Sequence, residues 1–218
     1  MKLRLGAAYS QQGRLPDALR LARELQKSEP KSPAPPLLMG TVLIAQQKPQ
    51  EAIEAFNSAL KLKGDLVDAH RGLGQAYQQL NQPDRAAESY HRALTLNGND
   101  AASLNNLAWL LSEVRKKPDE ALPLASKAEQ LAPMSPEVLD TLGWVHYRRG
   151  AFPEAEKALL RAVERAPNNG TILYHLGMTY ASLGKKQDAV SALRRAAQLD
   201  PKLRDSERID SLIRELGG

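Results

Sequence analysis

The sequence contains no cysteine, two tryptophans, two phenylalanines and no long apolar run. The absence of cysteine excludes disulfide bonds and thiol chemistry, and it leaves the redox compartment open. No apolar stretch approaches the roughly 20 residues that a helix needs to cross a bilayer. Aromatic residues make up only 5% of the chain while alanine and leucine are abundant, which favours thin layers of packed helices over one large core.

The charge of the chain is mild and mixed. A net charge of +5 is small for 218 residues, and no basic run is longer than Arg115–Lys117. Acidic residues precede basic ones along segments such as 152–165, as the helix dipole favours, which indicates solvent-exposed helix faces. Residues 1–5 lead directly into a repeat helix and not into the apolar core of a signal peptide. Because the first repeat opens two residues late, we expect the natural array to begin further upstream.

One set of small and apolar residues recurs along the chain at an interval of 34 residues. In the clearest copy it consists of Leu142-Gly143, Ala155, Leu159, Ala162 and Pro167. Two columns of small residues run through all six copies: Gly6, Gly40, Gly74, Ala108, Gly143 and Gly177, and Ala18, Ala52, Ala86, Ala121, Ala155 and Ala189. Self-similarity at a fixed period of this length predicts a stack of similar helical units.

The period divides the chain, residues 1–218, into a single array of six copies. We place them at residues 1–32, 33–66, 67–100, 101–135, 136–169 and 170–203, the first incomplete at its start and the fourth with one inserted residue near Arg115 to Pro118. The proline-rich segment 32–36 does not interrupt the period, so we interpret it as a turn between repeats; the alternative is a linker between two domains. Residues 204–218 break the pattern but carry apolar residues at helical spacing, which predicts a capping helix.

The two columns of small residues resemble the tetratricopeptide repeat (TPR) family, and the resemblance covers essentially the whole chain. In that family each unit is a pair of helices, and the small residues let the first and second helices approach closely. The resemblance implies an all-α fold, an α-solenoid of six TPR helix pairs in a right-handed superhelix, with the C-terminal capping helix added. It also implies a non-catalytic protein–protein interaction scaffold that binds a peptide or helical segment in the concave groove lined by the first helices.

A second, narrower resemblance concerns residues 104–111 and 140–145. They are similar to neighbouring repeats of bacterial cell-envelope TPR proteins associated with exopolysaccharide export and protein sorting. This resemblance implies a periplasmic or membrane-associated parent protein with this chain as its C-terminal portion; a cytoplasmic parent is the alternative.

The sequence carries no recognisable pattern for catalysis. The histidines, which are His70, His91, His146 and His175, show no pair at the i, i+4 spacing of a helical metal site. There is no G-x-S-x-G elbow, no phosphate-binding glycine loop and no kinase motif set. We therefore expect neither enzyme activity nor a metal or cofactor.

Each first helix of the expected fold presents one stripe of residues with i, i+4, i+7 spacing to the concave wall. The stripes are Leu3, Ala7 and Ser10; Leu37, Thr41 and Ile44; Arg71, Gln75 and Gln78; Asn105, Trp109 and Ser112; Asp140, Trp144 and Tyr147; and Tyr174, Met178 and Ala181. Aromatic rings can bury apolar side chains of a peptide, and amides can bond its extended backbone. We predict a partner-binding groove made of Arg71, Gln75, Gln78, Asn105, Trp109, Asp140, Trp144, Tyr147, Arg148, Tyr174 and Met178. The alternative is that Trp109 and Trp144 fill space between neighbouring first helices as ordinary core.

Two known binding modes of the TPR family do not carry over to this chain. The carboxylate clamp of chaperone-binding TPR domains uses paired lysines and asparagines; only Arg71 and Asn105 are similar here, and the lysines are absent. The asparagine ladder of sugar-transferase TPR regions is matched by Asn106 alone.

Two other functions stay open, self-association of the array and binding of RNA or another polyanion. The basic edge that would hold a polyanion comprises Arg14, Lys48, Arg115 to Lys117, Arg148-Arg149 and Lys185-Lys186. Acids at the starts of the next helices weaken its field, which disfavours nucleic acid.

Overall fold

A computed structural model describes residues 2–206 and 208–217, except for the side chains of residues 2, 3 and 206. Within these ranges the protein consists of α-helices and one π-helical turn, with no strand, so the predicted all-α class of paired helices is confirmed. The elements are α1 (Lys2–Gln11), α2 (Leu15–Ser28), α3 (Ala34–Ala45), α4 (Pro49–Leu62), α5 (Val67–Gln79), α6 (Pro83–Leu96), α7 (Ala101–Trp109), η1 (Leu110–Val114), α8 (Pro118–Leu131), α9 (Pro136–Arg148), α10 (Phe152–Arg165), α11 (Gly170–Ser182), α12 (Lys186–Leu199), α13 (Pro201–Ser206) and α14 (Ile209–Glu215).

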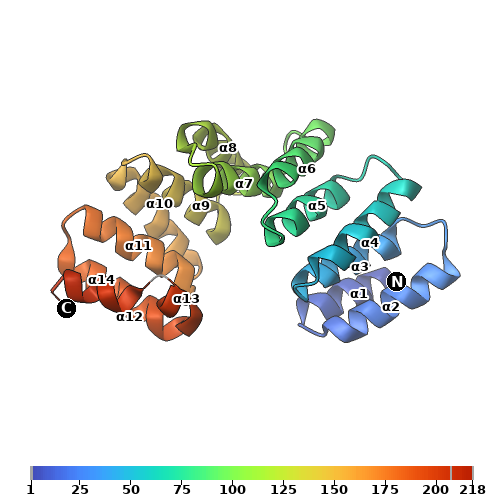
Figure 1. Ribbon diagram of the computed structural model, residues 1–218, viewed down its shortest axis with the longest axis horizontal. Coiled ribbons are helices and arrows are strands. Elements are labelled where there is room, and N and C mark those ends of the chain that lie inside the picture. Colours follow the sequence, from blue (N-terminus) through green and yellow to red (C-terminus); the bar gives the residue numbers. More distant parts are fainter. Residues whose placement is uncertain (1, 207, 218) are drawn as a thin grey trace. The chain divides into compact units, whose positions relative to one another are not determined.

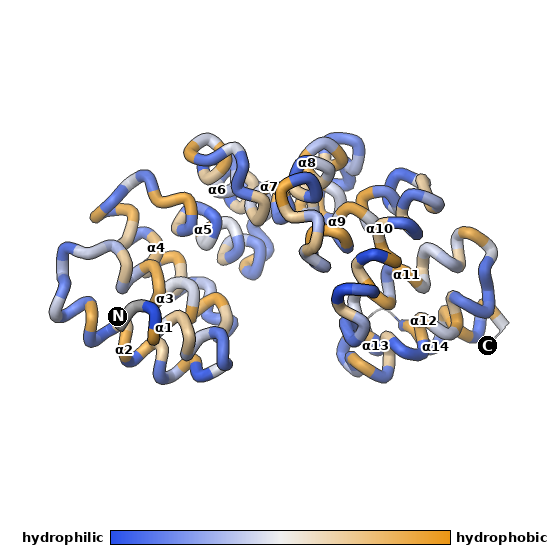
Figure 2. Tube along the Cα trace, turned by 180° about the vertical axis from the view of Figure 1, so that it is seen from behind, coloured by the Kyte–Doolittle hydropathy of each residue, from blue (hydrophilic) through white to orange (hydrophobic). Residues whose placement is uncertain are grey.

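The chain forms two compact units, residues 1–106 (unit 1) and 107–218 (unit 2), with the boundary inside α7. In each unit, successive helices pair as hairpins, and each pair contacts the next (Figure 1). In Figure 2 hydrophobic and hydrophilic positions are interspersed along the helices of each unit. This distribution is expected when each hairpin buries its apolar face against its neighbours. The assignment of residues 1–218 to one continuous array stays a prediction.

Proline marks the start of most second helices. It is the first residue of α4, α6 and α8 and the second residue of α2 and α10. Proline fits the first helical turn because its missing N–H would have no helical acceptor there. At α3 the same device appears in the segment 32–36: the helix begins at Ala34, and Pro35 and Pro36 are buried within its first turn. This is the inter-repeat turn expected from the unbroken period.

The glycine column brings the two helices of a hairpin into close contact. A Cβ added to Gly40 would lie 2.5 Å from a ring carbon of Phe56, and one added to Gly74 would lie 2.4 Å from a ring carbon of Tyr90. Gly143 and Gly177 meet a leucine of the partner helix in the same way. The alanine column is fully buried in all six copies. Both columns therefore act in packing, as predicted.

The residue inserted in the fourth copy is taken up one turn earlier than expected. Elsewhere the backbone N–H that closes the first helix bonds to a carbonyl five residues back, as Ala151 does to His146. In the fourth copy Lys117 bonds to Leu111, six residues back, and Leu111 lies within η1. Our expectation of an insertion in the turn at Arg115 to Pro118 is thus corrected: a π-helical turn absorbs the extra residue.

The C-terminal cap consists of two short helices, α13 and α14, and not of one helix over 204–218. Asp200 caps α13 by accepting hydrogen bonds from the amides of Lys202 and Leu203. The backbone of Arg208 is left-handed, which separates α14 from α13. Ile209 and Ile213 of α14 are buried in a core cluster that includes Leu193 of α12.

Candidate functional site

An apolar hollow of about 350 Å³ lies between α1 and α3 on unit 1. We call it the α1–α3 hollow; its lining residues are Ala7, Ser10, Gln11, Ala34, Leu37, Leu38 and Thr41. The hydroxyl of Thr41 donates to the carbonyl of Leu37 at 3.1 Å, so its hydrogen is used within α3. The volume falls within the range of small-ligand and side-chain pockets, and the lining is mostly hydrocarbon.

The hollow is lined by stripe residues of the first and second repeats. The predicted groove used residues of the third to sixth repeats only. The hollow residues Ala7 and Thr41 occupy the same repeat position as Trp109 and Trp144. Small side chains at this position leave volume between neighbouring first helices, whereas tryptophans fill it. The sequence signal for a hollow was therefore a run of small residues in the stripe. Leu3, the other predicted residue of this stripe, has no described side chain.

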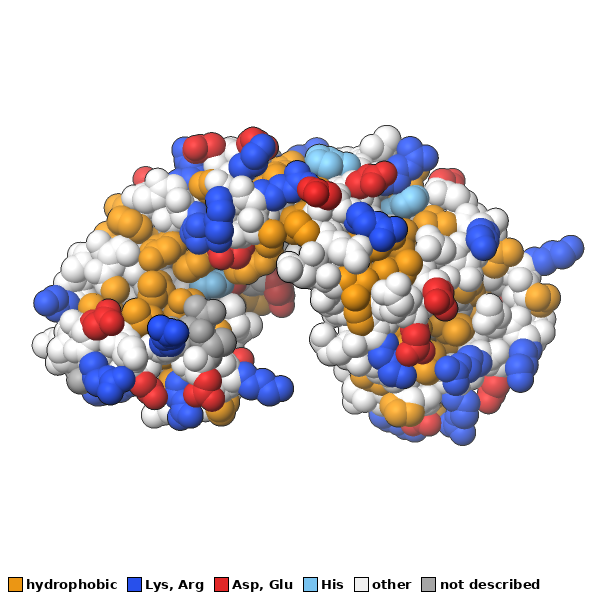
Figure 3. Space-filling view, viewed as in Figure 1, with side chains coloured by type: hydrophobic (Ala, Val, Ile, Leu, Met, Phe, Trp, Pro, Cys, Tyr) orange, Lys and Arg blue, Asp and Glu red, His pale blue; other side chains and the backbone are white. Residues whose placement is uncertain are grey.

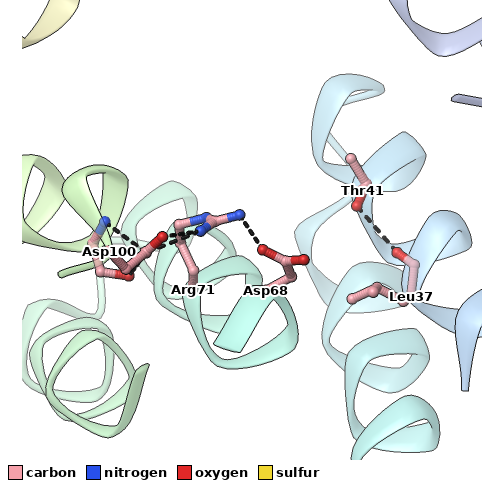
Figure 4. Close-up of polar contacts among 6 residues, drawn as sticks. Leu37, Thr41, Asp68, Arg71 and Asp100 are labelled. Atoms are coloured by element: carbon pink, nitrogen blue, oxygen red, sulfur yellow. Dashed lines mark hydrogen bonds and ion pairs between the residues drawn. The ribbon is translucent and has the colours of Figure 1, made fainter. Parts of the chain in front are cut away.

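Arg71 of α5 is held by two carboxylates (Figure 4). Its Nη1 donates to both oxygens of Asp100 at 2.8 and 2.9 Å, and its Nη2 donates to Asp68. Asp100 also accepts bonds from the amide and hydroxyl of Ser103. Partial burial alone would raise the pKa of Asp100, but the hydrogen bonds from Ser103 and Arg71 hold that pKa below its usual value. Arg71 therefore links α5 to the start of α7 and is not a free cation.

The other predicted groove residues of unit 1 are also partly engaged. The side-chain oxygen of Gln78 accepts a hydrogen bond from the hydroxyl of the buried Tyr90. Gln75 and Asn105 are half-buried. Gln75 occupies the repeat position that Thr41 holds in the preceding repeat.

In unit 2 the structure brings the predicted aromatic residues together. We call Trp109, Trp144, Tyr147, Tyr174 and His175 the aromatic cluster. Trp144 stacks on Tyr147 with ring centroids 4.6 Å apart and on His175 at 4.1 Å. The ring of Trp109 is 5.8 Å from that of His175. The residues of the predicted stripe thus meet, but mostly with one another.

Burial divides the aromatic cluster into core and surface. Trp144 is 7% exposed and Tyr174 is 8% exposed, and both belong to the hydrophobic core of unit 2. Asp140 is also buried, and its Oδ1 lies 2.7 Å from Nδ1 of His175. Trp109, Tyr147, Arg148 and Met178 keep part of their surface. A ligand on this face of unit 2 would therefore meet these four residues, with Trp144 and Tyr174 packed beneath.

Glu113 and His175 contact the predicted aromatic residues but were not predicted from the sequence. Glu113 lies in η1, where its Oε2 accepts a hydrogen bond from Nε1 of Trp144 at 2.8 Å and one from Arg148 at 3.3 Å. The one-residue insertion was the sequence signal that could have indicated the position of Glu113, because it shifts this residue relative to its counterparts in other repeats. His175 directly follows Tyr174, and only its burial shows that it packs inward.

The predicted basic edge is largely neutralised by carboxylates. Pairs within 3.3 Å join seven of its cations to acids: Arg14–Asp17, Lys48–Glu51, Lys116–Glu113, Lys117–Glu120, Arg148–Glu113, Arg149–Asp119 and Lys185–Glu156. On the face drawn in Figure 3, basic and acidic side chains are interspersed. Paired charges release few counterions from a bound polyanion, so this arrangement disfavours nucleic-acid binding.

The described residues hold no cluster of three or more side chains suited to a metal ion. His146 lies in a column that holds tyrosine in other repeats, and burial lowers its pKa. Within the same ranges, no helix is long and apolar enough to span a membrane.

Four family models of the tetratricopeptide repeat match the sequence, over residues 2–24, 40–81, 67–100 and 141–203. The chain belongs to this family. The TPR fold is in general that of a non-catalytic scaffold for protein or peptide partners.

Two curated relatives share only part of their length with this chain. The Pseudomonas aeruginosa TPR repeat-containing protein PA4667 is 37% identical over 78 residues, which are 36% of this chain and 13% of that protein. Human protein O-mannosyl-transferase TMTC3 is 29% identical over 161 residues, covering 72% of this chain and 18% of that protein. The chain thus spans a small fraction of the relatives it matches.

Solved structures show the same fold at low identity. A chain of the APC/C hetero-tetramer Cut9–Hcn1 superposes with a TM-score of 0.89 at 16% identity, over 99% of this chain and 42% of that one. YrrB, described as a TPR protein with an unusual peptide-binding site, gives 0.61 at 20% identity, over 83% of this chain and 92% of that one. These likenesses concern the fold.

Proposed function

We propose that this TPR protein is a non-catalytic scaffold that binds a peptide segment of a partner protein, with the α1–α3 hollow as the seat of an apolar side chain. The observation that carries the proposal is the hollow itself, an apolar space bounded by Leu37, Leu38 and Ala7 on the first-helix side of the hairpins. Burying one leucine there would contribute about 1.5–3 kcal/mol, which is roughly a ten- to hundredfold gain in affinity. YrrB, a TPR protein with an unusual peptide-binding site, supports peptide binding as a use of this fold.

The partly exposed residues of the aromatic cluster are a second surface of the same kind. Trp109, Tyr147, Arg148 and Met178 stay a predicted contact region of unit 2. Self-association of the array likewise stays a prediction.

The hollow can be closed without altering the core. Ala7 is exposed, and Ala7→Trp places there the residue that the fourth and fifth repeats carry at the same position. Ala7→Leu is a smaller replacement that fills part of the same space. Arg20→Trp, on the exposed surface of α2, is the matched control for adding a tryptophan.

The experiment selects 12-residue peptides from a random display library on the immobilised 218-residue chain, and then measures each selected peptide by fluorescence anisotropy. We expect a group of peptides that lose at least tenfold in affinity on Ala7→Trp and less on Ala7→Leu, and that bind Arg20→Trp normally. Circular dichroism and thermal unfolding verify that the variants fold. A selection that yields no peptide sensitive to either filling variant contradicts the proposal.

A further inference from the structure

The repeat positions that line the α1–α3 hollow on α3 hold chemically different side chains on α5. The residues Ala34, Leu37 and Thr41 of α3 correspond, one 34-residue repeat later, to Asp68, Arg71 and Gln75 of α5. Both helices are first helices of adjacent hairpins in unit 1, and they contact each other. A peptide that leaves the apolar hollow across α5 therefore passes from hydrocarbon to charged and amide side chains. Figure 4 shows Leu37 and Thr41 of α3 beside Asp68 and Arg71 of α5.

The exposed charge at this second position is negative. Arg71 is balanced by Asp100 and Asp68, so the three side chains together carry one net negative charge. The side chains of Arg71 and Asp100 are only 24% and 15% exposed, whereas that of Asp68 is 62% exposed. A ligand carboxylate would find no free cation here, and a ligand cation would find the carboxylate of Asp68.

We propose that the partner segment is internal and basic: an aliphatic side chain seated in the α1–α3 hollow, with a lysine or arginine placed against Asp68. Neighbouring helix axes lie about 8–10 Å apart, so the path from the hollow to α5 is roughly 12–15 Å. An extended chain covers this path in about four or five residues at about 3.3 Å each. The inference rests on the proposed function of the hollow and adds the charge and spacing of the ligand.

The test uses the peptides that lose affinity on Ala7→Trp, in terminally blocked form so that no free carboxylate takes part. Each is measured on the wild-type chain, on Asp68→Asn and on Asp68→Lys. Asp68→Asn removes the charge with little change in shape and leaves Arg71 bound to Asp100. Glu88→Lys, at an exposed carboxylate of α6, controls for the change in net charge.

The expected result is a basic residue about four or five positions from an aliphatic one in these peptides. Affinity should fall roughly two- to fivefold on Asp68→Asn, the range of an exposed ion pair, and further on Asp68→Lys, with no change on Glu88→Lys. Replacing the basic residue of the peptide by glutamate should restore binding to Asp68→Lys. Peptides that lose affinity on Ala7→Trp, but whose affinity changes equally on Asp68→Lys and Glu88→Lys, overturn this inference and leave the proposed function standing. If no selected peptide loses affinity on Ala7→Trp, both the proposed function and this inference are overturned.

Discussion

The indole N–H of Trp144 donates to a carboxylate oxygen of Glu113 at 2.8 Å. Glu113 lies in η1, the π-helical turn that absorbs the extra residue of the fourth repeat. Without that turn the helix would continue in register with its counterparts, and Glu113 would point elsewhere. One inserted residue therefore gives the most buried tryptophan of the stripe a partner for its only polar atom, as buried indoles generally require.

Removing this hydrogen bond should destabilise unit 2 by a measurable amount. We expect Glu113→Ala and Trp144→Phe each to lower the free energy of unfolding, with a coupling of about 1 kcal/mol between them, because the bond is charge-assisted but partly exposed. A double-mutant cycle in urea measures the coupling, with Glu113→Gln as the control that keeps an acceptor. Additive effects of the two substitutions would show that the contact contributes nothing.

Replacing each tryptophan by alanine should lower the free energy of unfolding by different amounts. Trp144 is 7% exposed and stacks on two rings, so Trp144→Ala should cost about 3–5 kcal/mol. Trp109 keeps more exposed surface, so Trp109→Ala should cost clearly less. Thermal unfolding of both variants tests the difference. Equal losses would mean that both rings are core, as in the alternative considered for the stripe.

Adding one methyl group to Gly74 should destabilise unit 1. Helix propensity favours alanine by about 1 kcal/mol, but overpacking a close helix contact costs about 1–3 kcal/mol. The Tyr90 ring, 2.4 Å from the new Cβ, is buried and bonded to Gln78, so it cannot retreat. We expect a net loss of up to about 2 kcal/mol for Gly74→Ala. Gly64→Ala is the control, because its Cβ would have no neighbour closer than 3.9 Å, and it should be neutral or slightly stabilising.

Acid should weaken unit 1 through Asp100. Its pKa is lowered in the folded protein, while an unfolded aspartate titrates near pH 4. Below that pH the unfolded chain binds a proton that the folded chain does not, so the stabilisation present above about pH 4 is lost as the pH falls toward the folded pKa. Urea unfolding of the wild type and Asp100→Asn between pH 3 and 7 measures this. The variant should be less stable at neutral pH, and the difference should shrink at pH 3; a constant difference would exclude the titration of Asp100 as the cause.

The hairpins could be predicted from the sequence because they depend on short-range spacing. Gly40, Gly74 and Ala155 mark helix contacts at fixed intervals, and Pro49 or Pro83 marks a helix start. These signals act within one repeat and recur, so each copy supports the others. The inserted residue was placed in the wrong segment because an insertion can be absorbed anywhere between two fixed points of the repeat. The hydrogen bond from the backbone N–H of Lys117 to the carbonyl of Leu111 shows where it is absorbed.

The candidate site was harder to predict because a hollow is volume left unfilled. Large rings such as Trp144 and Tyr174 suggested a binding wall, yet burial shows that they mainly pack. Ala7 and Thr41 carry little sequence signal on their own, although together they leave the α1–α3 hollow. Whether a stripe residue fills or opens the space depends on all its neighbours, which no single repeat specifies.

Amide chemical-shift mapping shows directly whether peptides bind at the α1–α3 hollow. One peptide from the selection on the wild-type chain, chosen without regard to the filling variants, is titrated into the ¹⁵N-labelled chain. We expect the largest shifts at Ala7, Ser10, Leu37 and Thr41, with smaller ones at Asp68 and Gln75. Largest shifts at the indole of Trp109 and at Tyr147 and Met178, with the hollow unchanged, would contradict this expectation.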